Sequence, residues 1–288
     1  MNYLIHILIM CEIYLILALA MNLLAGYTGL LSLAQTAFYG LGAYITALLL
    51  TKAGVSFPVS LAGAVLFNLI ACIPVIWFSS RLRDLFFALA TIAWQIVVFT
   101  ILHNWVSVTQ GPFGITGIPK PELFGYRLGS LAEFALLGSG ITGIILLFFI
   151  GFHQTPLSRL LQGVRDDQLA MMTFGKKPEY YKALAVLISS SISAVAGTLF
   201  ATYSGYIDPS SFTLNESIII VSMVLIGGLG TVKGSVAGAM FYVLLPEFLR
   251  FVQIPDEIGA NIRMMIYSLI LILLVMFRPH GLFGKYKF

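Results

Sequence analysis

The stretch MNYLIHILIMCEIYLILALAMNLL, residues 1–24, carries a single charged side chain, Glu12. A helix rises 1.5 Å per residue, so roughly 20 apolar residues cross a hydrocarbon core of about 30 Å. The stretch has neither the basic start nor the small-residue cleavage site of a signal peptide. We therefore expect a retained membrane-spanning helix.

Similar apolar runs recur along the whole chain of 288 residues, of which 59% are hydrophobic and 10% charged. Soluble proteins average about 25% charged residues, so composition indicates an integral membrane protein. The runs are continuous, whereas barrel strands alternate apolar and polar residues. Spans are expected at residues 4–24, 29–51, 57–79, 85–103, 134–152, 183–204, 215–232, 235–250 and 262–278. The expected fold class is all-α: one polytopic transmembrane helical bundle of about 8–10 spans, forming a single domain over residues 1–288.

The second of these spans differs from the others because it is rich in glycine. Its sequence includes GYTGLLSLAQTAFYGLGAY, residues 26–44. Glycine is unfavourable inside helices and permits irregular backbone. The region could therefore be a broken or re-entrant helix, which would move the N-terminus to the other face of the membrane.

The distribution of Lys and Arg indicates the orientation, because cytoplasmic loops carry the excess of positive charge. With the loop at about 153–182 placed in the cytoplasm, eleven Lys and Arg residues fall on that side and five on the other. The central loop and the C-terminus are therefore expected in the cytoplasm.

That central loop contains PLSRLLQGVRDDQLAMMTFGKKPEYYK, residues 156–182, with eight charged residues in 27 positions. At 100° per residue, one helical face collects the apolar side chains. Gly175 then provides a helix stop. We expect one or two short amphipathic helices, too polar to cross the bilayer.

Three interpretations of this amphipathic segment stay open from the residues alone. It could rest on lipid headgroups, it could be an ordinary connection, or it could dock its apolar side chains into a groove on a cytoplasmic partner. Helical spacing does not separate the first from the third.

Polar residues within the apolar spans are candidates for a translocation path, because polar groups at membrane depth usually face the bundle interior or a water-filled route. The alternative is that each one hydrogen-bonds a neighbouring helix. The polar residues of this kind are Glu12, Asn22, Gln35, Thr36, Asn68, Thr91 and Gln95, and five of them are assigned to the path: Asn22, Gln35, Thr36, Thr91 and Gln95.

Catalytic and metal chemistry are not indicated. The two cysteines fall inside predicted spans, and the four histidines lie far apart in sequence. The stretch GGLGTVKGS, residues 227–235, contains P-loop ingredients, but its order is Lys-Gly-Ser and it joins two hydrophobic runs instead of following a soluble strand. We expect no catalytic residue, no bound metal, and no nucleotide hydrolysis by this chain.

Five stretches, in order, resemble the LivM-type permease subunits of high-affinity branched-chain amino-acid ABC importers. They are GLLSLAQTAFYGLGAYITALL (29–49), RLRDLFFALATIAWQ (81–95), TQGPFGITGIP (109–119), SRLLQGVRDDQLAMMTFGKKPEYYK (158–182) and LIGGLGTVKGSVAGAMFYVLLPEFLR (225–250). The chain departs from that family at Gln35, where His is common, and over residues 165–168, which are Arg-Asp-Asp-Gln here.

The resemblance implies a set of partners and a location. These are a second, LivH-type permease subunit, two cytoplasmic ATPase subunits that bind ATP and Mg, and a periplasmic or lipid-anchored substrate-binding protein. The chain would then lie in the bacterial cytoplasmic (inner) membrane, bind no cofactor of its own and bind no nucleic acid. The substrates implied are branched-chain or other neutral amino acids.

The same resemblance identifies the amphipathic segment as an ATPase-coupling helix. The residues implied there are Leu157, Arg159, Leu161, Val164, Arg165, Asp166, Asp167, Met171 and Gly175, with Leu157, Leu161 and Val164 as apolar anchors. The binding protein is expected at two outer loops, residues 110–119 and 205–215. In the first loop the expected contacts are Gln110, Gly111, Pro112, Gly114, Thr116 and Gly117.

Other functions stay open alongside this one. A permease of the same family for urea or short amides would share these motifs. A secondary carrier that works alone, or a membrane scaffold subunit without a transport path, would account for the apolar spans but would need no ATPases.

Overall fold

A computed structural model describes residues 2–82, 84–123, 125–250, 265–266, 268–270, 272–273, 276–277 and 281–284. The expected span at 262–278 therefore lies mostly outside the described residues. Within the described part, the all-α prediction is confirmed, and the strands are four pairs of residues.

Among the residues that the structure describes, five helical stretches are long and apolar enough to cross a membrane: Asn2–Tyr27, Phe57–Arg81, Leu85–Asn104, Leu131–Gln154 and Pro178–Ser204. The first comprises α1 (Asn2–Asn22) and the π-helical turn η1 (Leu23–Tyr27), and the second comprises α3 (Phe57–Ala71) and α4 (Ile73–Arg81). The other three belong to α5 (Asp84–Asn104), α7 (Leu131–Gln154) and α10 (Pro178–Ser204).

Three further helices match the remaining described spans: α2 (Gln35–Thr51), α11 (Leu214–Gly227) and α12 (Val232–Arg250). The span expected at 29–51 is corrected at its start, because residues 29–34 are not helical and α2 begins at Gln35. This agrees with a broken helix in the glycine-rich region. Among the described helices, α11 is also short, with 14 residues.

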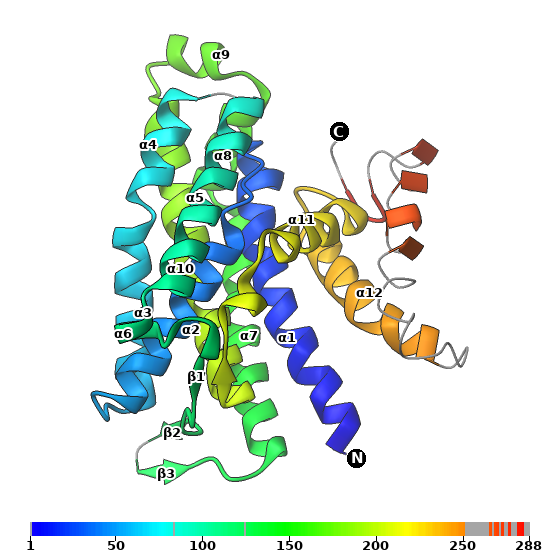
Figure 1. The fold of residues 1–288 in the computed structure, drawn as a ribbon. Coiled ribbons are helices and arrows are strands. Elements are labelled where there is room, and N and C mark those ends of the chain that lie inside the picture. Colours follow the sequence, from blue (N-terminus) through cyan, green and yellow to red (C-terminus); the bar gives the residue numbers. More distant parts are fainter. Residues whose placement is uncertain are drawn as a thin grey trace.

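Figure 1 shows the long helices standing side by side, with α11 crossing α1 and α12 sloping away from it. The connecting elements gather at the two ends of this bundle. At one end lie α8 (Pro156–Asp166) and α9 (Gln168–Thr173), and toward the other lie α6 (Val106–Thr109), η2 (Gly111–Phe113), β1 (Ile115–Thr116), β2 (Glu122–Leu123), β3 (Tyr126–Arg127), β4 (Tyr206–Ile207) and η3 (Pro209–Phe212).

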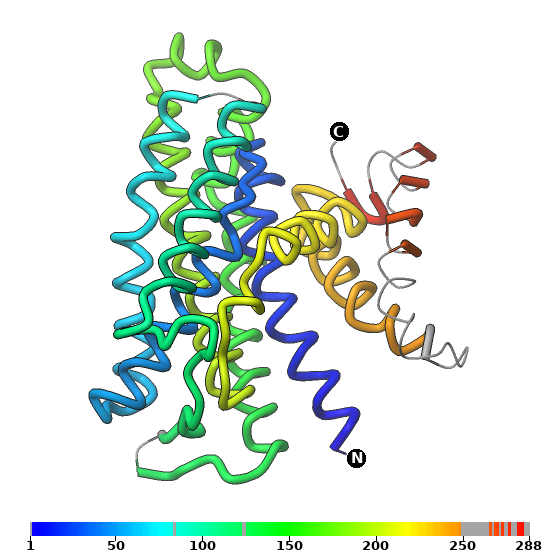
Figure 2. The backbone as a smooth tube through the Cα atoms, in the orientation of Figure 1, coloured from blue at the N-terminus to red at the C-terminus, as the bar shows by residue number. Residues whose placement is uncertain are grey.

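The N-terminus lies at the end opposite α9, as the tube in Figure 2 shows. With the central loop expected in the cytoplasm, this arrangement places the N-terminus on the outer side. The irregular stretch 29–34 explains it: α1 runs the full depth of the bundle, and α2 starts inside the bundle and returns to the outer side.

The centre of the bundle is the contact between α2 and α10, where small residues bring two backbones together. A Cβ on Gly197 would lie 2.1 Å from the carbonyl oxygen of Tyr39, and a Cβ on Gly42 would lie 2.6 Å from the Cα of Ala194. Glycine is therefore required at both positions.

We predict that Gly197→Leu destabilises the protein by about 1–3 kcal/mol or more, because the added side chain would force α2 away from α10. The midpoint of thermal unfolding in detergent measures the effect. Gly140→Leu is the matched control, because a Cβ on Gly140 meets no atom within 4 Å. Equal midpoints for the two variants would contradict the packing described here.

Candidate functional site

The amphipathic segment forms two short helices joined at Asp167. Thr155 caps α8 by accepting from the backbone N–H of Ser158 at 3.3 Å. The Asp167 carboxylate caps α9 by accepting from the N–H groups of Leu169 and Ala170 at 2.8 and 3.0 Å. A side-chain cap satisfies N–H groups that a helix start leaves free, so Asp167 fixes the break between α8 and α9.

The helix stop expected at Gly175 is confirmed. Gly175 has a φ of +71°. Its N–H donates to the carbonyl of Met172, and the N–H of Lys176 donates to the carbonyl of Met171, both at 3.0 Å. These two bonds are the C-terminal pattern that requires a left-handed residue after the helix.

The anchor role expected for Leu161 and Val164 is corrected by the structure. Both are 0% exposed, because α8 lies against α7, α10 and η1 and buries its apolar face within the same chain. Leu157 also packs against this core. The apolar helical face predicted from the sequence is present in α8. Its spacing alone does not show whether that face packs on its own chain or in a groove of a partner.

Several exposed apolar side chains of this end belong to α9 and its C-terminal cap. Leu169 and Met172 are exposed, and Phe174 is 77% exposed. Met171 instead packs on α8, with its Sδ 2.8 Å from where a Cβ on Gly163 would lie. Arg159 and Asp166 are exposed on α8 and remain available as a charged rim.

Arg165 connects α8 to the end of the first span. Its guanidinium donates to the carbonyl of Gly26 in η1. Its side chain also lies along Gly29, where a Cβ would be 3.0 Å from Arg165 Cγ. This contact joins residues far apart in sequence, so helical spacing within the central loop could not have found it.

Lys182 makes a second contact between distant segments. The sequence indicated only its positive charge and not this contact. Lys182 is buried at the start of α10. Its ammonium donates to Gln168 Oε1 at 3.1 Å and to the carbonyl of Ser79 at 3.4 Å. It therefore ties α9 and α10 to α4.

The five candidate path residues all lie buried inside the bundle. Thr36 accepts from Ser217 Oγ at 2.8 Å, and Gln95 Nε2 donates to the carbonyl of Phe212 at 2.9 Å. Thr91 accepts from the N–H of Leu33 at 3.0 Å, within the irregular stretch. Each bond joins two different segments, as expected if these residues hold neighbouring helices together. A role for them in the translocation path stays a prediction.

Gln35 and Asn22 make the same kind of contact. The Gln35 amide bonds Ser193 and accepts from Ser189 Oγ on α10, the latter at 3.3 Å. Asn22 Nδ2 donates to Ser235 Oγ at 2.8 Å, and Asn22 Oδ1 accepts from the N–H of Gly230 at 2.8 Å. Asn22 thereby holds the turn between α11 and α12 against α1.

The two outer loops lie together, because β1 pairs with β4 in an antiparallel ladder that matches Ile115 with Ile207. Gln110 has a φ of +61°, which is uncommon for a residue other than glycine. A Cβ on Gly114 would lie 2.2 Å from the carbonyl oxygen of Ile207, so glycine is required there. Gly111 is buried.

The tip of this loop is open to a partner. Pro112, Thr116 and Gly117 are exposed, and Phe113 is 81% exposed.

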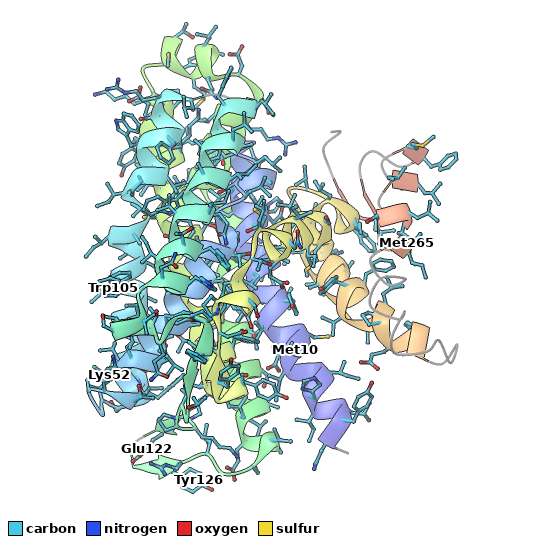
Figure 3. All side chains as sticks on the ribbon, viewed as in Figure 1. Met10, Lys52, Trp105, Glu122, Tyr126 and Met265 are labelled. Carbon is cyan, nitrogen blue, oxygen red and sulfur yellow. The ribbon has the colours of Figure 1, made fainter. Side chains whose placement is uncertain are left out.

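Figure 3 shows Lys52 and Trp105 on one flank of the bundle, with Glu122 and Tyr126 at its outer end. Burial raises the pKa of nearby Asp208, but hydrogen bonds from Ser210 and Ser211 outweigh burial and lower it overall.

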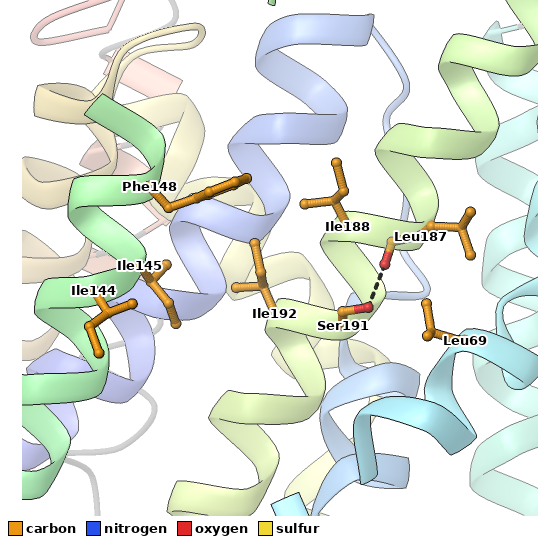
Figure 4. A pocket seen from close by; sticks show the side chains of 8 residues that line it. All are labelled: Leu69, Ile144, Ile145, Phe148, Leu187, Ile188, Ser191 and Ile192. Atoms are coloured by element: carbon orange, nitrogen blue, oxygen red, sulfur yellow. Dashed lines mark hydrogen bonds between the residues drawn. The ribbon is translucent and has the colours of Figure 1, made fainter. Parts of the chain in front are cut away.

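A groove of about 390 Å³ lies between α3, α7 and α10 (Figure 4). Its lining is almost entirely aliphatic and aromatic. The one hydroxyl in it, of Ser191, donates to the carbonyl of Leu187 at 2.8 Å and is already satisfied. The groove therefore suits hydrocarbon and offers no partner for a charged solute.

No group of three or more His, Cys, Asp or Glu residues that could hold a metal ion occurs in the described part of the chain. Both cysteines are free.

Comparisons with known proteins agree with the membrane architecture. The family described as "Branched-chain amino acid transport system / permease component" matches residues 3–277. LivM of Escherichia coli (strain K12), a high-affinity branched-chain amino acid transport system permease protein, is 30% identical and is matched over 94% of this chain and 67% of its own length. LivM of Salmonella typhimurium is 31% identical over 95% of this chain and 68% of its own.

A second permease type is also similar. LivH of Salmonella typhimurium, a permease protein of the same kind of system, is 24% identical over 94% of this chain and 91% of its own length. No solved structure matches the chain. The family match covers nearly the whole sequence, and the five long apolar helices make the chain a multi-pass membrane protein. This chain therefore belongs to the family of permease components of branched-chain amino acid transport systems.

Proposed function

We propose that residues 1–288 form one permease domain of a binding-protein-dependent ABC importer for branched-chain or other neutral amino acids. The chain forms the translocation path with a LivH-type permease in the bacterial inner membrane. Two cytoplasmic ATPases bind ATP and Mg, and a periplasmic or lipid-anchored protein delivers the substrate.

The observation that carries the proposal is the family match over residues 3–277, on a bundle with two different ends. One end presents the exposed side chains of α9, and the other presents the paired outer loops. These two surfaces suit an ATPase and a binding protein, respectively.

The coupling step follows from Arg165 and Lys182. ATP-driven closure of the ATPases moves α9 and α8. Arg165 passes this movement to the end of η1, and Lys182 passes it to α4 and α10. The bundle then changes between outward-open and inward-open arrangements, a rigid-body transition of a kind common in switching proteins.

The direct test is uptake into vesicles that contain both permeases and both ATPases, with the binding protein outside and ATP inside. We expect ATP-dependent uptake of L-leucine, L-isoleucine or L-valine. This chain alone should transport none of them, because the energy enters through the ATPases. Uptake by the chain alone would favour a secondary carrier, and uptake of urea instead would favour the amide importer.

Two matched phenylalanine variants test the assignment of the two ends. Phe174→Glu should weaken association with the ATPases at least about tenfold, because an exposed aromatic anchor at an interface contributes a large share of binding. Phe113→Glu should leave ATPase association unchanged and weaken the stimulation of ATP hydrolysis by the loaded binding protein. Co-purification and ATPase assays measure both. A reversed pattern would show that the ends are assigned wrongly.

Arg165→Gln tests the coupling contact. Loss of a hydrogen bond made by a charged group costs about 1.5–3 kcal/mol, so we expect uptake per ATP hydrolysed to fall about tenfold while the ATPases still co-purify. Lys177→Gln, at an exposed position beside α10, is the matched control and should behave as wild type. Unchanged uptake in Arg165→Gln would remove Arg165 from the coupling route.

A further inference from the structure

Two short helices begin inside the bundle and touch where they begin. The first residues of α2 follow the irregular stretch 29–34, and α11 follows η3. They meet at Thr36 and Ser217, whose hydroxyls are 2.8 Å apart. In transporters, interrupted helices at membrane depth commonly mark the place where a solute is bound.

Glu216 lies next to this contact, on the first turn of α11. Its carboxyl lies within electrostatic range of the Tyr14 hydroxyl of α1, and its Oε1 is enclosed without a hydrogen-bond partner among the described residues. Tyr242 of α12 lies beside Tyr14, with ring centroids 5.1 Å apart, and Tyr39 of α2 lies within electrostatic range of the carboxyl. Four helices therefore bring one acid and three tyrosines together.

Glu216 makes no ion pair with any residue that the structure describes, and the ion pair of Arg127 with Glu122 lies at the outer end. A buried carboxylate is stable only when a cation or several donors compensate it. Glu216 is half-buried with one enclosed oxygen, so its carboxyl can hold a proton when no cation is near, and its charged form would accept a cationic group as a partner.

The position of the cluster fits a solute path. Tyr14 is twelve residues along α1 from Asn2, roughly 18 Å at the usual helical rise, which is near the middle of the 26-residue first span. Tyrosine rings attract ammonium groups in addition to the carboxylate. Oε1 of Glu216 is enclosed in this arrangement, and an alternating-access cycle that moves α1, α2, α11 and α12 apart would open it to a solute.

We propose that Glu216 receives the ammonium group of the amino acid as it passes through the membrane, with Tyr14 positioning the carboxylate and Tyr39 and Tyr242 supplying aromatic surface. This inference rests on the proposed function, because an amino acid carries the ammonium group and urea does not. It distinguishes the two candidate substrate classes by a residue of the permease itself.

Glu12 provides a matched control in the same helix as Tyr14. Glu12 is buried, 6% exposed, whereas Glu216 is half-buried with one enclosed oxygen, and neither carboxyl oxygen of Glu12 has a partner among the described residues. Its Oε2 faces α7, lying 2.2 Å from where a Cβ on Gly138 would be. Glu12 thus shares the chemistry of Glu216 without the interrupted helices or the tyrosines.

The test measures labelled L-leucine taken up per ATP hydrolysed by the full complex in vesicles. We expect Glu216→Gln to lower this ratio at least about tenfold, because a cation that binds a buried site loses its counter-charge. Glu12→Gln should leave the ratio unchanged. Where Glu216→Gln fails to assemble, Tyr14→Phe decides, since it removes a single hydroxyl and should lower the ratio severalfold.

A ratio equal to that of the wild type in Glu216→Gln would contradict the ammonium site. The same result in Tyr14→Phe would contradict it if Glu216→Gln does not assemble. In both cases the proposed function would still stand, provided that the wild-type complex takes up L-leucine. An equal loss in Glu12→Gln would also overturn the ammonium site, because any buried carboxyl would then have the same effect. If the wild-type complex takes up urea and no L-leucine, the amino-acid function fails first, and the ammonium site fails with it.

Discussion

Backbone hydrogen bonding inside hydrocarbon is the constraint on which this structure depends. A peptide group that leaves a helix at membrane depth has no water to bond, and each unsatisfied group costs several kcal/mol. The chain breaks regular helix between Tyr27 and Gln35 and again around α11. It supplies the missing partners from other helices: Thr91 accepts from Leu33, Arg165 donates to Gly26, and Asn22 accepts from Gly230.

Buried polar residues hold the interrupted helices in place, and others line the uninterrupted helix α10, among them Ser190 and Thr202. The contact between α2 and α10 packs by shape at Gly42 and Gly197 and also carries the Ser189–Gln35 hydrogen bond, and α2 is held to α11 by the Ser217–Thr36 hydrogen bond. Helices held by a few hydrogen bonds can change their contacts more readily than helices whose apolar side chains interdigitate closely. The interrupted helices α2 and α11 are thus joined by a polar contact that is suited to rearrangement.

Sequence reasoning could predict what is local. Apolar runs placed the eight described spans within a few residues at most ends, and the Gly175 stop followed from its neighbours. It could not place Leu161 and Val164, because an apolar helical face is the same whether it packs on its own chain or on a partner. It also could not connect Arg165 with Gly26 or Glu216 with Tyr14, since these pairs form only after distant segments fold together.

The small β1–β4 ladder connects two loops at one end of the bundle to the long helix α10. It attaches the loop after α5 to the loop after α10, so a protein resting on either loop pulls on the outer end of α10. That helix is 27 residues long, about 40 Å, and its inner end holds Lys182. It is uninterrupted, unlike α2 and α11. α10 can therefore act as a rod that reports events at the outer surface to the inner one, while the interrupted helices beside it change their contacts.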